Sequence, residues 1–362
     1  MLRLQSISLV QFRNYEQQSF SFTERIVGIC GLNGTGKTNL LDAVYYLSFS
    51  KSYFSRPDPQ NVSHGLTGMR LDAKYKLFNQ LQQVTCILRE NNRKELSINE
   101  ETYQKFSDHI GKIPCVMIAP DDVSMIIGGS EERRKFIDTL ISQINKEYLT
   151  NLIAYNKILQ QRNYLIKSSV ESGESDEILL QVLNEQLCTT GNFIFEERKQ
   201  FLVAFLALTS AIYKRIAGKE DGIKIMYESA LLHNSFAKLL NNSREKDFAM
   251  QRTTTGIHKD DLVFFMNNHL FKTAASQGQR KSLLFALKLA EWQVLKDKKG
   301  FTPILLLDDV FEKLDELRMF QLLHWVCTES DGQVFITDTH ANRLQLQMAE
   351  ISVPYQLIEL SG

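Results

Sequence analysis

The chain has 362 residues, of which 43% are hydrophobic and 23% charged, and its formal net charge is zero. This composition is typical of a globular protein with room for two domains. It excludes a protein that coats nucleic acid with its whole surface, which would be basic. The five cysteines lack Cys-x-x-Cys spacing, and no apolar run approaches the roughly 18 residues of a membrane span. We therefore expect reduced thiols, a cytoplasmic protein and no membrane partner.

The first part of the chain has the alternating pattern of β-strands. Asn91-Asn92 lies between two of these segments and is typical of a hairpin turn. We expect strands over residues 3–9, 18–22, 26–30, 69–77, 83–89 and 95–98.

A glycine-rich loop follows the third strand. Residues 31–38 read Gly-Leu-Asn-Gly-Thr-Gly-Lys-Thr, a full match to the phosphate-binding pattern G-x-x-x-x-G-K-[ST], between a strand and a helix. The Lys37 ammonium would reach the β- and γ-phosphates, and the Thr38 hydroxyl would bind Mg²⁺. A glycine-rich tight turn is the alternative, but it does not explain the Lys-Thr pair. The predicted nucleotide-binding residues are Gly31, Leu32, Asn33, Gly34, Thr35, Gly36, Lys37 and Thr38.

From Glu131 onward, apolar residues recur at three- and four-residue steps, which indicates helices. We expect one long helix from residue 131 to 167, a break at 168–175, and a second long helix over 176–217. The two would form a helical hairpin, and a third helix is expected near residues 235–240.

Strand and loop patterns return after residue 250. We expect a hairpin of residues 262–266 with 269–272, an amphipathic helix over 281–295, and strands over 303–309 and 333–337 with a helix between them. The nucleotide-binding fold is therefore predicted to be split. Residues 1–125 and 250–362 would form it, and residues 126–249 would form an inserted helical lobe.

Four apolar residues followed by Asp308-Asp309 have the form of a buried parallel strand that ends in carboxylates. Asp308 would hold Mg²⁺, and Asp309 would orient or deprotonate the attacking water. A strand ending in a solvated acidic turn is the alternative. Asp315 follows, although an exposed helix start explains it as well.

The segment Ser-Gln-Gly-Gln at residues 276–279 directly precedes the amphipathic helix. Ser276 at a helix start caps that helix, or it binds a phosphate together with Gly278 and Gln279. Since Ser276 is far from Lys37 in sequence, this phosphate could belong to another subunit. Whether Thr337 or His340 senses the γ-phosphate is left open, because a lone histidine after a strand is usually a surface residue.

These elements, in this order, resemble the ABC-type ATPase heads of SMC-like DNA repair proteins, and the RecF family in particular. The likeness covers nearly the whole chain and includes segments outside the ATPase motifs. Within one of them, Ile257 and Lys259 stand where the family has Pro and Arg. The segments are residues 9–15, 38–43, 51–52, 132–138, 157–163 and 256–262.

The resemblance implies an α/β fold: a P-loop ATPase head with a mixed sheet, an antiparallel β subdomain and a helical lobe. It implies ATP and Mg²⁺ as cofactors and a homodimer in which Lys37 and Thr38 of one subunit face Ser276 of the other. ATP would close the dimer on duplex DNA beside a single-strand gap, and slow, DNA-stimulated hydrolysis would open it. RecR and RecO would be partners in loading RecA during recombination, replication and the SOS response to DNA damage.

Residues 133–167 contain seven Lys/Arg and only two Asp/Glu, which is a local positive excess in a neutral protein. A basic strip on a helix favours contacts with DNA phosphates, although a solvated helix face is the alternative. The candidates for DNA binding are Arg133, Arg134, Lys135, Lys157, Arg162, Lys51 and Arg56.

Three other classes of protein are weighed against this interpretation. A transporter ATPase subunit would need a membrane partner and a shorter gap between Lys37 and Ser276. A chromosome-organising SMC protein would need a far longer coiled coil. A P-loop kinase would need a lid and an acceptor site, and it leaves the Ser-Gln-Gly-Gln motif unexplained.

Overall fold

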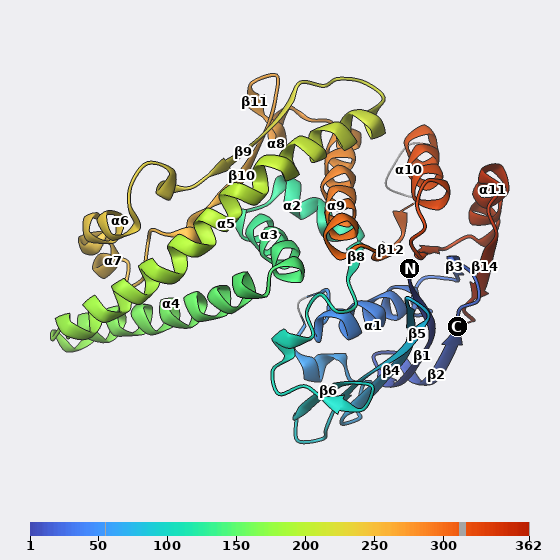
Figure 1. Cartoon of the computed structure of the whole chain (residues 1–362), viewed down its shortest axis with the longest axis horizontal. Coiled ribbons are helices and arrows are strands. Elements are labelled where there is room, and N and C mark those ends of the chain that lie inside the picture. Colours follow the sequence, from blue (N-terminus) through green and yellow to red (C-terminus); the bar gives the residue numbers. More distant parts are fainter. Residues whose placement is uncertain (55, 311–315, 362) are drawn as a thin grey trace. The chain divides into compact units, whose positions relative to one another are not determined.

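The computed structural model describes residues 1–54, 56–310 and 316–361, and the chain divides into two compact units (Figure 1). The first unit comprises residues 1–123, 215–218 and 276–362, and the second comprises 124–214 and 219–275. Asp315 lies outside the described residues.

Residues 250–275 lie in the second unit, whereas the sequence analysis places them in the ATPase head. The reason is strand pairing. β10 (Asp261–Met266) pairs antiparallel with β9 (Ile223–Glu228) along its whole length, and β11 (His269–Leu270) completes a three-stranded sheet. The predicted hairpin around Asn267-Asn268 is present.

The first unit contains a parallel sheet of five strands in the order β14-β3-β13-β12-β8. Its inner strands are buried along their whole length, as continuous apolar runs require in a sheet covered on both faces. The predicted strands β3, β12 and β13 are confirmed, and β8 and β14 are additional. The strands are β3 (Ile26–Cys30), β8 (Cys115–Ile118), β12 (Ile304–Leu307), β13 (Val334–Asp338) and β14 (Tyr355–Glu359).

An antiparallel sheet in the order β2-β1-β4-β5-β6-β7 makes the second layer of this unit. The predicted meander is confirmed, and Asn92 at its turn has a positive φ of 62°. Helix α1 contacts strands of both sheets, and one hydrophobic core joins them. The strands are β1 (Leu2–Phe12), β2 (Tyr15–Ser21), β4 (Met69–Leu77), β5 (Gln80–Leu88), β6 (Lys94–Ile98) and β7 (Glu101–Thr102).

The helices of the first unit are α1 (Lys37–Phe49), α9 (Gln277–Lys299), α10 (Glu316–Thr328) and α11 (Ala341–Ile351). Three short 3-10 helices, η1 (Asp58–Asn61), η2 (Phe106–Asp108) and η3 (Pro120–Val123), lie in the loops.

The second unit contains the helical hairpin of α4 (Lys146–Ser172) and α5 (Glu177–Ala217) (Figure 1). Arg162 bonds to Asn184 near one end and Tyr148 to Arg198 near the other, so the helices run antiparallel. The remaining elements are α2 (Ser124–Ile127), α3 (Ser130–Ile144), η4 (Ala230–Leu232), α6 (Phe236–Asn242), α7 (Arg244–Ala249), η5 (Ile257–Lys259) and α8 (Phe271–Ala274).

The prediction of a single helix over residues 131–167 is wrong. The chain leaves the helical conformation at Asn145, where φ is −133° and ψ is 105°. The Asn145 side chain accepts a hydrogen bond from the Tyr148 amide at 3.0 Å and caps α4. Since asparagine is a strong N-cap residue, it ends one helix and begins the next without Pro or Gly.

By length and composition, α5 passes as a membrane span, with a mean hydropathy of 1.3 in an 18-residue window. A single such helix is weak evidence, because long core helices meet the same criterion. Arg198 of α5 is buried and pairs with Asp138 and Asp260 of the same unit. These buried ion pairs indicate that α5 packs as a helix of the second unit.

Candidate nucleotide-binding site

Three segments that are distant in sequence meet at the carboxyl ends of the parallel strands. The Thr38 hydroxyl, at the start of α1, donates to the two carboxylate oxygens of Asp308 at 3.0 and 2.9 Å. The Thr337 hydroxyl, in β13, donates to the same carboxylate at 2.8 Å. Because the strands are parallel, their carboxyl ends share one edge, and the predicted phosphate loop and aspartate are brought together there.

The Lys37 ammonium is hydrogen-bonded to the phosphate loop itself. Its Nζ donates to the carbonyl oxygens of Gly31 at 2.7 Å and Leu32 at 2.9 Å, and the residue is only 8% exposed. Gly31, Gly34 and Gly36 have φ values of 156°, 88° and 105°, of which the last two lie well inside the left-handed region that favours glycine. A phosphate bonds an ammonium more strongly than a carbonyl does, so an anion in the loop would compete for Lys37.

The turn between β1 and β2 supports the loop from behind. The Tyr15 hydroxyl donates to the Gly36 carbonyl at 3.1 Å, and Asn14 Nδ2 donates to the Thr35 carbonyl at 3.2 Å. A Cβ on Gly36 would lie 2.6 Å from the Asn14 amide and 2.7 Å from the Tyr15 hydroxyl, so this glycine is needed for the close approach. No local pattern predicts a role for Asn14 or Tyr15, and their only signal in the sequence is their place in segment 9–15, which resembles the family.

Arg13 joins the same turn to helix α1. Its guanidinium pairs with the buried Asp42 carboxylate and donates to Asn39 at 2.9 Å and Ser52 at 2.9 Å. Burial raises the pKa of Asp42, and the Arg13 charge opposes that rise. This ion pair holds the helix that carries Thr38 against the antiparallel sheet.

Asp308 is 3% exposed, and burial raises the pKa of its carboxyl group. The hydroxyls of Thr337 and Thr38 lower this pKa, whereas the charge of Asp309 raises it. Oxygen ligands of this type are those that Mg²⁺ prefers, so the Thr38 and Asp308 oxygens fit the predicted metal.

Asp309 has a positive φ of 48°, in a region that non-glycine residues rarely adopt. Its backbone amide donates to the Thr337 hydroxyl at 2.8 Å. Thr337 is fully buried and thus positions both aspartates, whereas His340 is exposed and lies beside Thr339. Backbone strain of this kind is common at functional sites.

Ser276 caps helix α9, as one of the two interpretations expects. Its hydroxyl accepts from the Gln279 amide at 3.2 Å, and the Gln279 side chain accepts from the Ser276 amide at 2.9 Å. The serine is exposed, and its hydroxyl keeps a proton to donate. Gly278 gives room for Arg318, whose Nη1 would lie 2.7 Å from a Cβ on that glycine.

The structure corrects two of the candidates for DNA binding. Arg133 is 8% exposed and its guanidinium holds both carboxylate oxygens of Asp261, at 2.6 and 3.0 Å. Arg162 is 1% exposed and pairs with the buried Asp247 at 2.8 Å. Neither guanidinium can reach a DNA phosphate, because each neutralises a carboxylate inside the second unit.

The other candidates for DNA binding lie at the surface. Arg134 is half-buried and donates to the carbonyl oxygen of Asp260 at 2.7 Å. The exposed candidates, which remain predictions, are Lys135, Lys157, Lys51 and Arg56.

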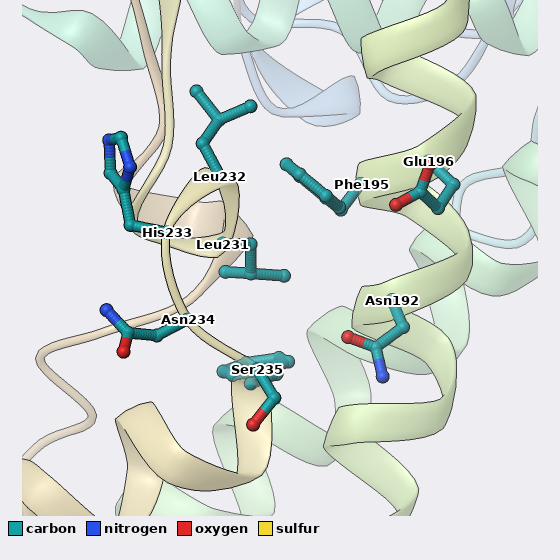
Figure 2. A pocket seen from close by; sticks show the side chains of 9 residues that line it. Asn192, Phe195, Glu196, Leu231, Leu232, His233, Asn234 and Ser235 are labelled. Carbon is teal, nitrogen blue, oxygen red and sulfur yellow. The ribbon is translucent and has the colours of Figure 1, made fainter.

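A pocket in the second unit, with an accessible volume of about 370 Å³, lies between α5 and residues 231–236. Figure 2 shows Phe195 and Glu196 on the α5 side and His233 on the opposite loop. The described residues that line it include no Lys or Arg to bind a phosphate group, so this pocket does not suit a nucleotide.

The chain matches the family model of the RecF/RecN/SMC N-terminal domain over residues 3–356. It is 42% identical to the DNA replication and repair protein RecF of Flavobacterium johnsoniae, over 99% of this chain and 100% of the relative. The RecF protein of Azobacteroides pseudotrichonymphae is 41% identical over 99% of this chain and 98% of that protein.

Among solved structures, a recombination mediator protein RecF-ATP of the RecFOR pathway has a TM-score of 0.86 and 28% identity. The match covers 94% of this chain and 92% of that one. The Smc head domain from Pyrococcus furiosus has a TM-score of 0.54 at 16% identity, covering 96% of this chain and 92% of that one, and shows the fold alone. The predicted ABC-type ATPase fold with a helical insertion is confirmed.

Proposed function

Because the chain belongs to the RecF family of DNA replication and repair proteins, we propose that it is an ATP-dependent DNA clamp acting in the cytoplasm. The observation that carries this proposal is the contact of Thr38 with Asp308, reinforced by Thr337. It joins the phosphate loop to the acid-bearing strand, as a nucleotide switch requires. A related structure described as RecF-ATP supports ATP as the nucleotide.

Each residue of the site has a distinct role in this proposal. Lys37 leaves the carbonyls of its own loop to bind the β- and γ-phosphates, while the Gly31–Gly36 amides surround them. Thr38 and Asp308 would hold Mg²⁺, which would neutralise phosphate charge. Asp309 orients the attacking water. Its carboxylate is short, so hydrolysis is slow and serves as a timer.

ATP closes a homodimer in which Ser276 of one subunit donates to the γ-phosphate held by Lys37 of the other. The exposed N-terminus of α9 is suited to this role, because the capping Ser276 hydroxyl keeps a proton to donate and the helix dipole places positive charge at this end. Closure clamps duplex DNA beside a single-strand gap, and the clamp works with RecR and RecO to load RecA. RecR and RecO are supported as partners by the related RecF-ATP structure, whose protein acts in the RecFOR pathway.

The test measures ATP binding and ATP-driven dimerisation of the full chain. Lys37→Ala should lose ATP affinity, because a charge and a phosphate contact are removed together. Ser276→Arg should keep ATP affinity and lose the dimer. Ser235, an exposed serine whose side chain caps α6, gives the matched control Ser235→Arg, which should still dimerise. Normal ATP affinity in Lys37→Ala, or dimers of Ser276→Arg, would contradict the proposal.

A further inference from the structure

Four basic side chains lie around the loop of residues 250–260 in the second unit. Lys246, Arg252 and Lys259 are exposed, and Arg134 is half-buried. We call these four residues the basic cluster. They come from α3, α7 and the segment 252–260, so their proximity is a product of folding and not of local sequence.

Hydrogen bonds within this loop fold it back on itself. The Arg252 amide donates to the Asp247 carbonyl at 3.0 Å, which brings Arg252 to the end of α7 that carries Lys246. His258 bonds through Nε2 to the Thr253 carbonyl at 3.2 Å, which holds the next part of the loop beside it.

Arg134 fastens the far end of the loop. Its guanidinium donates to the carbonyl oxygen of Asp260 at 2.7 Å, one residue beyond Lys259. The Tyr155 hydroxyl of α4 is hydrogen-bonded to His258 Nδ1 at 2.7 Å. The loop is therefore rigidly attached, and its basic side chains are presented from a fixed backbone.

The carboxylates around this loop are neutralised from the interior. Asp247 pairs with Arg162 at 2.8 Å, Asp260 with Arg198 at 2.8 Å, and Asp261 with Arg133 at 2.6 Å. These three arginines are buried, and their charges neutralise these acids.

The positive charge of the basic cluster is therefore not neutralised by ion pairs among the described residues. Among the described residues, none of its four members forms an ion pair with a carboxylate. Burial lowers the pKa of Lys259, and the charges of Arg252, Arg134 and Lys246 lower it further, as expected where like charges gather. Such a surface attracts anions.

We propose that the basic cluster of Arg134, Lys246, Arg252 and Lys259 binds the backbone phosphates of DNA. This inference rests on the proposed function and names a surface through which the clamp holds its substrate. The interior arginines are positioning residues, since they leave the surface cations free to meet phosphate. An open, multi-residue surface suits a chain of phosphodiesters better than one small anion.

The test compares two triple variants of the full chain that lose the same charge. Lys246→Gln, Arg252→Gln and Lys259→Gln remove the exposed cluster. Lys167→Gln, Lys199→Gln and Lys214→Gln are the matched control, because these exposed lysines already pair with Glu171, Glu196 and Glu220. Binding to gapped duplex DNA is measured with ATP between about 50 and 200 mM salt.

Each lost phosphate contact reduces the slope of log K against log salt by about 0.9. Three lost contacts reduce the slope by about 2.7. Over a fourfold change in salt, the cluster variant should therefore lose roughly 40-fold less affinity than the wild type. The control should follow the wild type within about threefold. If the triple variant does not fold, Lys259→Gln alone should reduce the slope by about 1.

The outcomes separate the two proposals. A wild-type protein that binds no DNA would overturn the proposed function and this inference together. A wild type that binds, with equal slopes in the cluster and control variants, would overturn only the inference. Tripolyphosphate is also titrated into Lys37→Ala protein, whose nucleotide site is disabled. Cluster-dependent binding of that anion, with DNA binding unchanged, would assign the cluster to a free phosphate and refute the DNA site.

Discussion

Replacement of Thr337 by valine tests whether this buried hydroxyl holds the two aspartates in place. Thr337 is fully buried and makes hydrogen bonds of 2.8 Å to the Asp308 carboxylate and the Asp309 amide. Valine keeps the shape of the side chain and removes both bonds. The Asp308 carboxylate then loses one of the donors that oppose its raised pKa.

The size of the effect follows from the two bonds. A hydrogen bond to a charged group contributes about 1.5 to 3 kcal/mol, and a neutral one about 1 kcal/mol. The free energy of unfolding of the first unit should therefore fall by about 3 kcal/mol. For a unit of roughly 200 residues this lowers the Tm by about 6 to 12 °C. Thr337→Ser keeps the hydroxyl and should lose only about 1 kcal/mol for the missing methyl group.

Thermal unfolding of the full chain provides the assay, and the transition of the first unit is the one that ATP raises. MgATP affinity is measured on the same proteins and should weaken in Thr337→Val more than in Thr337→Ser. Equal Tm values for the valine and serine variants would refute the assignment of Thr337 as the residue that positions the aspartates.

Three further predictions follow from the described contacts. Asp309→Asn should retain ATP binding and slow hydrolysis by about 100-fold or more, since the carboxylate that orients the attacking water is lost; wild-type turnover would remove Asp309 from the mechanism. Glu291 is buried, and burial raises its pKa from its ordinary value of 4.5 to about 7, so its contribution to stability is full below pH 4.5 and is lost as pH rises from there through 7. Glu291→Gln should therefore lessen the decline in Tm between about pH 5 and pH 7, and an unchanged decline would contradict the raised pKa. Arg198→Met leaves the Asp138 and Asp260 carboxylates without their partner and should destabilise the second unit by about 3 to 5 kcal/mol in urea unfolding. The exposed Lys199→Ala should cost less than about 0.5 kcal/mol, and similar losses in the two variants would contradict the role of Arg198.

Local pattern was sufficient for the motifs and most strands of the ATPase head. The phosphate loop and the Asp308-Asp309 strand end are contiguous in sequence, so their chemistry is readable before folding. The sequence pattern does not predict the break at Asn145, because the break contains no Pro or Gly. An asparagine can be recognised as an N-cap only once the helix that it begins is known.

The basic residues of the helical lobe show the limit of sequence reasoning. Arg133 and Arg162 have the same charge as Lys157 and lie in the same basic segment, yet they are buried in ion pairs while Lys157 is exposed. Their partners, Asp261 and Asp247, are far away along the chain. Helical periodicity places residues on a face, but it does not say which distant carboxylate meets that face.

The class of protein, the nucleotide loop and the acids beside it follow from the amino-acid sequence, because they depend on contiguous residues with fixed chemistry. The positioning of both aspartates by Thr337, the support of the loop by Asn14 and Tyr15, and the choice of which cations stay at the surface become visible only in the folded chain. Those properties depend on contacts between segments far apart in the chain. Such contacts are set by the packing of whole elements, which no local pattern encodes.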